Sequence, residues 1–176
     1  MLLAFDVHYR ENEARIVGVF FNWEDIEPIR IVIENVNEVK EYIPGEFYKR
    51  ELPCLIKVIA KVDLSNIEAI IIDSPIYVDN FETFGLGGKL YESLNKKIPI
   101  IGLAKNSFYS NSMTVKEVLM GMSKKPLYVS TIGIDLNLAV EKVKKMYGNY
   151  LIPDILKKLD SITKHHSISG VFVFCV

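Results

Sequence analysis

The sequence of 176 residues lacks the features that mark several classes of protein. It has two cysteines, Cys54 and Cys175, too few for a disulfide framework or a cysteine-based metal site. No apolar run reaches the ~20 residues that a bilayer requires. The first residues contain no basic segment and meet an acidic residue at Asp6, unlike a signal peptide. We therefore expect a protein of the reduced cytoplasmic compartment with no membrane partner.

The composition is that of a globular domain. Hydrophobic residues make up 49% of the chain and charged residues 24%, with a net charge of −1, and no repeat or low-complexity tract occurs. A chain of this length can bury roughly 70% of the surface that it exposes when unfolded. We expect one domain over residues 1–164, followed by an apolar tail over 165–176 that packs on the domain or forms a strand of a dimer.

The small net charge conceals an uneven distribution. Residues 1–85 hold 8 Lys/Arg and 16 Asp/Glu, whereas residues 86–164 hold 13 and 6. Carboxylates that gather a metal ion and a basic side that faces a phosphate-bearing partner would give such a pattern. Solvated helix faces would give it too, and charge alone favours that simpler interpretation.

Hydrophobic periodicity predicts three strands in quick succession, and then strands that alternate with helices. The expected strands are residues 2–9, 14–21, about 26–34, 67–73, 98–103 and 127–132, and the expected helices are about 46–61, 86–96, 136–147 and 153–164. Pro53 should begin or kink the first helix, Asp135 should cap the third, and Thr114 with Glu117 predicts a short helix that starts with a capping box. The order predicts an α/β fold: a mixed sheet with an antiparallel three-strand meander followed by parallel β-α units, and helices on both faces.

Two aspartates interrupt this apolar pattern. Asp6 lies inside the first strand, and Asp73 ends the apolar run of the strand at 67–73. A carboxylate in such a place is costly unless it is paired or binds a cation. If the two strands are neighbours, the carboxylates face each other, and Mg²⁺ would relieve their repulsion. Each aspartate alone could instead accept hydrogen bonds from a loop backbone.

Several motifs, in their order and spacing, resemble the endonuclease V family, which has an RNase H-like fold and cuts nucleic acid near deoxyinosine or inosine with Mg²⁺. The similarity extends over roughly residues 2–164. The motifs are Tyr42-Ile43-Pro44-Gly45, Arg50-Glu51-Leu52-Pro53, Ile72-Asp73, Pro99-Ile100-Ile101-Gly102-Leu103-Ala104-Lys105, Pro126 to Ser130, and Tyr150 to Pro153 followed by Asp160.

The resemblance implies a role for each matching residue. Asp6 and Asp73 match the metal-binding aspartates, and Glu51 matches the catalytic glutamate of the helix. Lys105 matches a lysine near the scissile phosphate, and Asp160 stands where the family has a further His or Asp near the metal. The side chains expected to hold the metal are therefore those of Asp6, Asp73 and Glu51, with Asp160 as a further candidate.

The turn of Tyr42, Ile43, Pro44 and Gly45 matches the family's nucleic-acid contact, a wedge that fills the gap left by a base turned out of its strand. The implied activity is that of a metal-dependent endonuclease of nucleic-acid repair. It would hydrolyse a phosphodiester bond 3′ to deoxyinosine or inosine in DNA or RNA, using Mg²⁺, with Mn²⁺ as the alternative ion. The implied partner is nucleic acid, and a monomer is favoured.

The loop after Asp73 departs from the family pattern. In the family this loop contains Gly and His and a His-Pro-Arg element, and it shapes the pocket for the turned-out base. Here it reads Ser74-Pro75-Ile76-Tyr77-Val78-Asp79-Asn80. Two alternatives therefore stay open: a nuclease of this type with another lesion specificity, and a nucleic-acid-binding module without catalysis.

Three further features have two interpretations each. His8 shares the strand face of Asp6, where it could assist the metal site, although an ordinary strand histidine is favoured. Trp23 could stack on a base, although packing on the meander is favoured. Gly87 and Gly88 at a helix start could receive a phosphate, although close packing of the helix on a strand is favoured.

Overall fold

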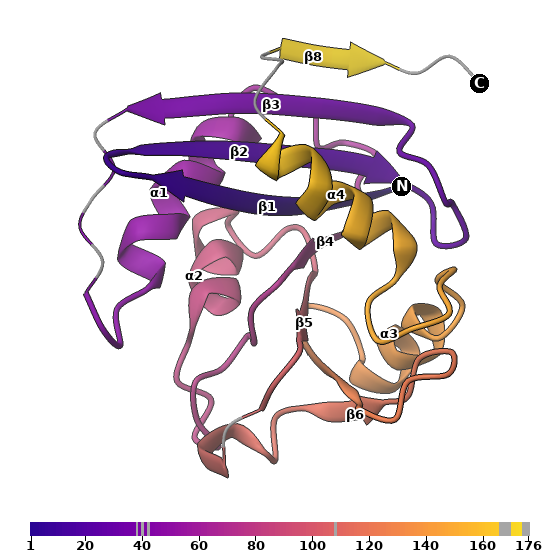
Figure 1. Ribbon diagram of the computed structural model, residues 1–176. Helices are drawn as coiled ribbons and strands as arrows, with labels where there is room; N and C mark the ends of the chain where they lie inside the picture. Colours follow the sequence, from indigo (N-terminus) through magenta and orange to yellow (C-terminus); the bar gives the residue numbers. More distant parts are fainter. Residues whose placement is uncertain (38, 40, 42, 108, 166–169, 174–176) are drawn as a thin grey trace.

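The computed structural model describes residues 1–37, 39, 41, 43–107, 109–165 and 170–173, and these residues build a mixed sheet of eight strands (Figure 1). The spatial order of the strands is β6-β7-β5-β4-β1-β2-β3-β8. The strands are β1 (Leu2–Arg10), β2 (Glu13–Phe21), β3 (Arg30–Asn37), β4 (Ala69–Ile72), β5 (Ile100–Ala104), β6 (Lys116–Val118), β7 (Leu127–Ile132) and β8 (Gly170–Val173). The helices are α1 (Tyr48–Ile59), α2 (Leu86–Ser93), α3 (Leu136–Val143) and α4 (Asp154–Lys164), with a 3₁₀ turn at Tyr109–Asn111.

The topology confirms the predicted α/β fold with its meander. β1, β2 and β3 pair antiparallel in chain order, whereas β4 pairs parallel with both β1 and β5. β7 returns antiparallel beside β5, and β6 covers its far edge. From the apolar tail, β8 pairs antiparallel with β3, so this end of the chain extends the sheet.

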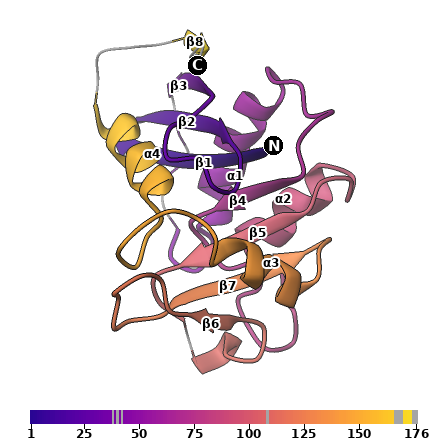
Figure 2. The same cartoon turned by 90° about the vertical axis from the view of Figure 1, so that its right-hand side faces the viewer.

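Helices cover both faces of the sheet because the central strands are apolar on both sides. Leu3 and Phe5 of β1 pack with α1 and α2, whereas Leu2 and Ala4 pack with α3 and α4. Figure 2 shows α4 and α1 on opposite sides of β1 and β2. Within the described segments, no helix has the length and apolar character needed to cross a bilayer.

The structure differs from the sequence prediction at several element boundaries. No helix begins at Thr114; residues 116–118 instead form β6, because Val118 is buried and pairing with β7 outweighs the local cap signal. The Thr114 hydroxyl donates to the Asn111 carbonyl at 2.9 Å. Asp135 caps α3 as predicted, accepting from the Leu138 N–H at 2.9 Å, but the helix ends at Val143. Pro53 lies inside α1 and does not begin it, and β3 starts at residue 30, not 26.

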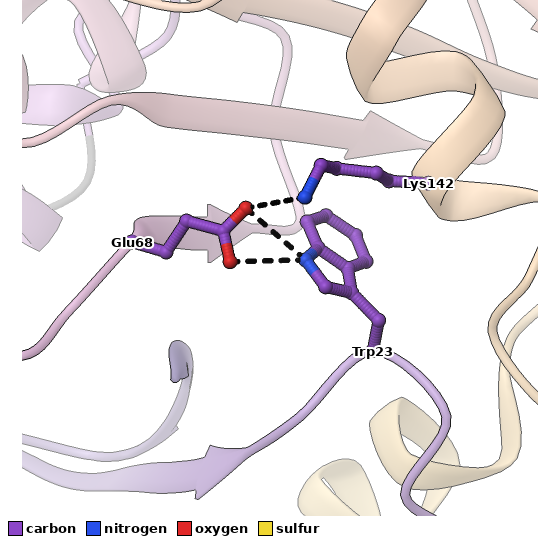
Figure 3. A network of polar contacts seen from close by, with 3 residues as sticks. All are labelled: Trp23, Glu68 and Lys142. Atoms are coloured by element: carbon purple, nitrogen blue, oxygen red, sulfur yellow. Dashed lines mark hydrogen bonds and ion pairs between the residues drawn. The ribbon is translucent and has the colours of Figure 1, made fainter.

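Trp23 belongs to a polar network that ties three elements together (Figure 3). Its indole N–H donates to the Glu68 carboxylate, with 3.3 Å to each oxygen, and Lys142 Nζ lies 2.6 Å from Glu68 Oε1. The Lys142 ammonium also lies 5.3 Å from the indole ring centroid. The network joins the β2–β3 loop, the segment before β4, and α3. Because Glu68 precedes β4 and Asp73 follows it, Trp23 lies away from the carboxyl edge, and its packing role is the one observed.

A close crossing of chain segments fixes the path of the loop after Asp73. A Cβ atom on Gly102 would lie 2.3 Å from the Ser74 carbonyl oxygen and 2.8 Å from Ser130 Oγ. The buried Ser130 hydroxyl accepts a hydrogen bond from the Ile76 N–H at 3.0 Å. Gly102 is therefore required for the loop to cross β5 at this height.

We expect Gly102→Ala to lower the free energy of unfolding by roughly 1–3 kcal/mol, because the new methyl group forces the Ser74 carbonyl to move. Ser130→Ala should cost a comparable amount, since it leaves the buried Ile76 N–H without a partner. Urea denaturation at neutral pH measures both values. Wild-type stability in Gly102→Ala would mean that the loop does not cross β5 this closely.

Candidate active site

The pairing of β1 with β4 brings Asp6 and Asp73 to the same edge of the sheet. The strands are parallel and Phe5 lies opposite Ile72, so Asp6 and Asp73 occupy the next positions on adjacent strands. Side chains alternate along a strand, which places both carboxylates on the face covered by α4. The condition set by the sequence argument, that these two strands are neighbours, is met.

β5 and α4 add charged side chains beside these two aspartates. Lys105, which follows β5, has its Nζ 3.4 Å from Asp73 Oδ2. Asp160 on α4 pairs with Lys164 Nζ at 2.7 Å. Asp6, Asp73, Lys105 and Asp160 all line one pocket of about 140 Å³, whose floor is apolar. The pocket thus has a carboxylate-rich rim and a lysine that can reach into it.

Glu51 approaches the same edge from α1. It is half-buried, and burial is the main cause that raises its pKa to about 8, followed by the charges of Asp6 and Asp73. The pKa of Asp6 is also raised, first by burial, and further by the charges of Asp160 and Asp73, while a hydrogen bond with the Thr163 side chain opposes the rise. The carboxylates are therefore close enough to disfavour one another's charge.

The donor set suits a hard divalent cation. Carboxylate oxygens are the ligands that Mg²⁺ and Mn²⁺ prefer, and a divalent cation would offset the mutual repulsion that adds to the effect of burial on these pKa values. In the described part of the chain, however, no three His, Cys, Asp or Glu side chains are already arranged to hold a metal ion. Asp73 instead contacts Lys105, and Asp160 contacts Lys164. The chemistry of the site fits a cation, and binding would require these lysines to release their partners.

The turn before α1 presents two of the predicted wedge residues. Ile43 is 49% exposed, Pro44 is exposed as well, and Gly45 has a φ of +81°, which favours glycine. The Ile43 carbonyl accepts from the Glu46 N–H at 3.0 Å and closes the turn. Tyr42, the first residue of this motif, lies outside the described residues. The turn leads directly into α1, so the exposed apolar tip and Glu51 belong to one continuous segment of the chain.

Two residues near Asp6 were not singled out from the sequence. Thr163 lies three residues after Asp160 on α4, so both side chains project from the same helix face toward β1. Lys164 pairs with Asp160, and the charge of Asp6 also contributes to raising its pKa. The i, i+3 spacing from Asp160 was the available signal for Thr163, but it has meaning only once α4 is known to lie over β1.

The loop that departs from the family pattern is well organised. The Asp79 carboxylate accepts from the Phe81 N–H at 2.9 Å and the Thr83 N–H at 3.0 Å. Tyr77 and Phe84 form a bridge across the loop base, with ring centroids 5.8 Å apart. This arrangement leaves the Phe81 side chain 93% exposed. At the start of α2, added Cβ atoms on Gly87 and Gly88 would clash with Ile76 and Phe84, so those glycines serve close packing.

Comparisons with known proteins identify a family and a shared fold. The endonuclease V family profile matches residues 1–119. Among solved structures, human ENDOV aligns with a TM-score of 0.71 at 18% identity, covering 93% of this chain and 82% of that chain. An endonuclease V from Ciona intestinalis, in complex with a 24mer DNA containing an inosine followed by a ribo-adenosine, aligns at 0.74 and 16% identity, covering 93% and 83%. The endonuclease V of Streptomyces avermitilis aligns at 0.69 and 21% identity, covering 93% and 79%. A search of the curated proteins finds no match. At these identities, the structural matches show a shared fold.

The raised pKa of Glu51 predicts how stability without metal depends on pH. Between the ordinary carboxyl pKa near 4.5 and about 8, the folded protein holds a proton that the unfolded chain releases, so stability falls as pH rises through this window. Glu51→Gln removes this loss. In chelator, the free energy of unfolding of Glu51→Gln should match the wild type at pH 5 and exceed it by on the order of 4 kcal/mol at pH 9.

Glu46→Gln is the matched control, because Glu46 precedes the same helix and pairs with Lys49 at the surface. Chemical denaturation at both pH values measures the difference. An equal effect of the two substitutions would contradict the electrostatic coupling of Glu51 to Asp6 and Asp73.

Proposed function

Because this chain belongs to the endonuclease V family of nucleases, we propose that it is a Mg²⁺-dependent endonuclease acting at a deaminated base. It hydrolyses a phosphodiester bond on the 3′ side of deoxyinosine or inosine in DNA or RNA, and Mn²⁺ can replace Mg²⁺. The observation that carries the proposal is the parallel pairing of β1 with β4, which sets Asp6 beside Asp73 with Glu51 and Lys105 at the same edge. The inosine-containing DNA bound to the Ciona intestinalis enzyme supports the choice of base.

Three carboxylates would hold the ion, with Asp160 as a further candidate. Asp6 and Asp73 would bind it directly, and Glu51 would complete the set directly or through water. When bound, a divalent cation would supply compensation of the phosphate charge and a lower pKa for water. In the cation-free protein, Glu51 retains a proton near neutral pH. Ionised in the loaded site, its carboxylate can accept a proton from the attacking water.

Lys105 acts at the phosphate. Its ammonium group is half-exposed and lies at the pocket, 3.4 Å from Asp73. A lysine is a compact cation with three donors, suited to a non-bridging phosphate oxygen. Without substrate, Lys105 neutralises Asp73; with substrate, it turns to the phosphate where negative charge develops.

The turn of Tyr42, Ile43, Pro44 and Gly45 contacts the nucleic acid. An exposed apolar tip can fill the gap that a turned-out base leaves, which offsets part of the few kcal/mol that unstacking costs. Its direct connection to α1 would couple insertion of the tip to the position of Glu51.

A second candidate is the same nuclease chemistry with another lesion specificity. The observation in its favour is the loop at 74–84, where Asp79 organises a tip that exposes Phe81. This loop replaces the Gly- and His-containing segment of the family pattern, so its side chains would shape a different base pocket.

We expect Asp73→Asn to lower the rate of cleavage at least 10³-fold in Mg²⁺, because the ion loses a charged ligand, while nucleic-acid binding persists. The substrate is a labelled oligonucleotide with one inosine, and circular dichroism confirms folding. Asp63→Asn is the control, since Asp63 lies in the turn before β4, where it caps Ser65, at the opposite end of the sheet. If neither the wild type nor Asp73→Asn cleaves any substrate, a binding module replaces the nuclease proposal.

A panel of otherwise identical oligonucleotides separates the two candidate specificities. Inosine, uracil, xanthine and an abasic site each occupy the same position in DNA and in RNA strands. Preferential cleavage of the inosine-containing oligonucleotides supports the first candidate, an endonuclease that acts at deoxyinosine or inosine. A preference for another lesion supports the second candidate.

Lys105→Met should reduce kcat about 10²-fold to 10³-fold with a smaller change in KM, because the positive charge acts mainly as charge builds on the phosphate. Lys105→Arg should restore part of the rate. Lys97→Met is the matched control, as Lys97 is exposed and precedes β5, at the other end of that strand. Single-turnover kinetics measure the chemical step, and a wild-type rate in Lys105→Met would remove this residue from the mechanism.

A further inference from the structure

A second pocket lies on the same sheet face as Asp6, formed by the meander strands. Its volume is about 220 Å³, and its polar and charged lining comes from β1, β2 and β3. The lining residues are His8, Arg10, Glu13, Ala14, Arg15 and Asn35. Among them, two arginines accompany a single carboxylate, so the charged lining of this pocket is mainly positive, opposite to that of the carboxylate site.

The register of β1 and β2 fixes how close this pocket is to the carboxylates. Asp6, His8 and Arg10 alternate onto one face of β1, and Arg15 of β2 lies opposite His8. One two-residue step along a strand covers roughly 7 Å. Arg15 therefore sits one such step, and one strand, away from Asp6.

The Arg15 side chain is a buried cation that forms no ion pair with any described residue. It is only 8% exposed, and its Nε has no hydrogen-bond partner among the described residues. No ion pair joins it to a carboxylate in the described part of the chain. A guanidinium stays charged in a protein, and a buried charge is costly unless an opposite charge accompanies it. An anion that enters the pocket would supply that charge.

We propose that this pocket binds a backbone phosphate of the nucleic-acid substrate, one or two nucleotides from the bond that is cut. The identity of the ligand rests on the proposed nuclease function, whereas the preference for an anion rests on Arg15. The planar guanidinium offers two parallel N–H donors to phosphate oxygens. Arg10 at the exposed rim adds a second positive charge. Such a contact fixes the position of the strand without reading its sequence.

Equilibrium binding in chelator tests the proposal without cleavage. The probe is a fluorescent duplex oligonucleotide, with or without one inosine, titrated from 50 to 200 mM salt. Arg15→Met keeps an apolar stem and removes the charge. This substitution should weaken binding about tenfold for both oligonucleotides. It should also reduce the magnitude of the negative slope of log K against log salt by about one. Lys124→Met, which removes an exposed charge between β6 and β7, at the other end of the sheet, should change neither value.

A substitution in the oligonucleotide gives a second, independent measurement. Neutral methylphosphonates replace single phosphates around the cleavage position, one at a time. One position should weaken binding of the wild type about tenfold and have little further effect on Arg15→Met, since that contact is already lost. If Arg15→Met does not fold, Arg10→Ala at the exposed rim replaces it in both measurements.

Several results would overturn the proposal. Wild-type affinity and salt slope in a folded Arg15→Met would do so, as would the lack of any methylphosphonate position whose effect depends on Arg15. Inorganic phosphate that raises the Tm of the wild type but not of Arg15→Met, with no oligonucleotide binding, would assign the pocket to a free anion and reject the backbone phosphate.

The outcome is separable from that of the proposed nuclease. A wild type that cleaves nothing, yet loses affinity and salt slope on Arg15→Met, would reject the nuclease and support the phosphate pocket. Cleavage by the wild type, together with unchanged binding by Arg15→Met, would support the nuclease and reject the phosphate pocket.

Discussion

The register between β1 and β4 is the constraint on which the rest of the structure depends. It is fixed by apolar side chains: Phe5 and Ile72 meet on the α1 face, and Ala4 and Ile71 on the α4 face. A slip by one residue would turn every side chain of β1 to the other face and place Asp6 in the core beneath α1 and α2. Hydrophobic packing therefore holds two carboxylates side by side, although their charges repel.

This arrangement concentrates negative charge that the fold balances only in part. Burial and the charges of Asp6 and Asp73 raise the pKa of Glu51 to about 8. Asp73 contacts Lys105, and Asp160 contacts Lys164. The two ion pairs are solvent-exposed and contribute little stability, so they are easily exchanged for other partners. The core holds the carboxylates together while the lysines are weakly bound, and this combination fits the proposal that a divalent cation and a phosphate replace those lysine contacts.

Sequence reasoning succeeded where a local pattern coincides with burial. The apolar runs of β1, β2 and β4 predicted these strands, whereas the adjacency of Asp6 and Asp73 was a condition that only the pairing of β1 with β4 could meet. It failed at Thr114, because the pairing of β6 with β7 is a contact distant in sequence that a local capping signal does not contain. It also gave no indication that Arg15 is buried, because the burial of this side chain depends on three strands meeting in one register. The chemical roles assigned to Asp6, Glu51, Asp73 and Lys105 stay proposals until cleavage is measured.

The charge asymmetry of the chain illustrates why totals over a sequence are a poor guide to a surface. The cationic pocket around Arg15 is built from residues 8–35, inside the half of the chain with twice as many acidic as basic residues. By contrast, the lysines beside the carboxylates come from the basic half of the chain. Lys105 follows β5, and Lys164 lies on α4. Along β1 itself, Asp6 faces the same side as His8 and Arg10, so one strand passes from an anionic centre to a cationic pocket within four residues. This change of charge along β1 suits the proposed nucleic-acid substrate. One of its phosphates would lie at the metal-binding site and another beside the Arg15 guanidinium.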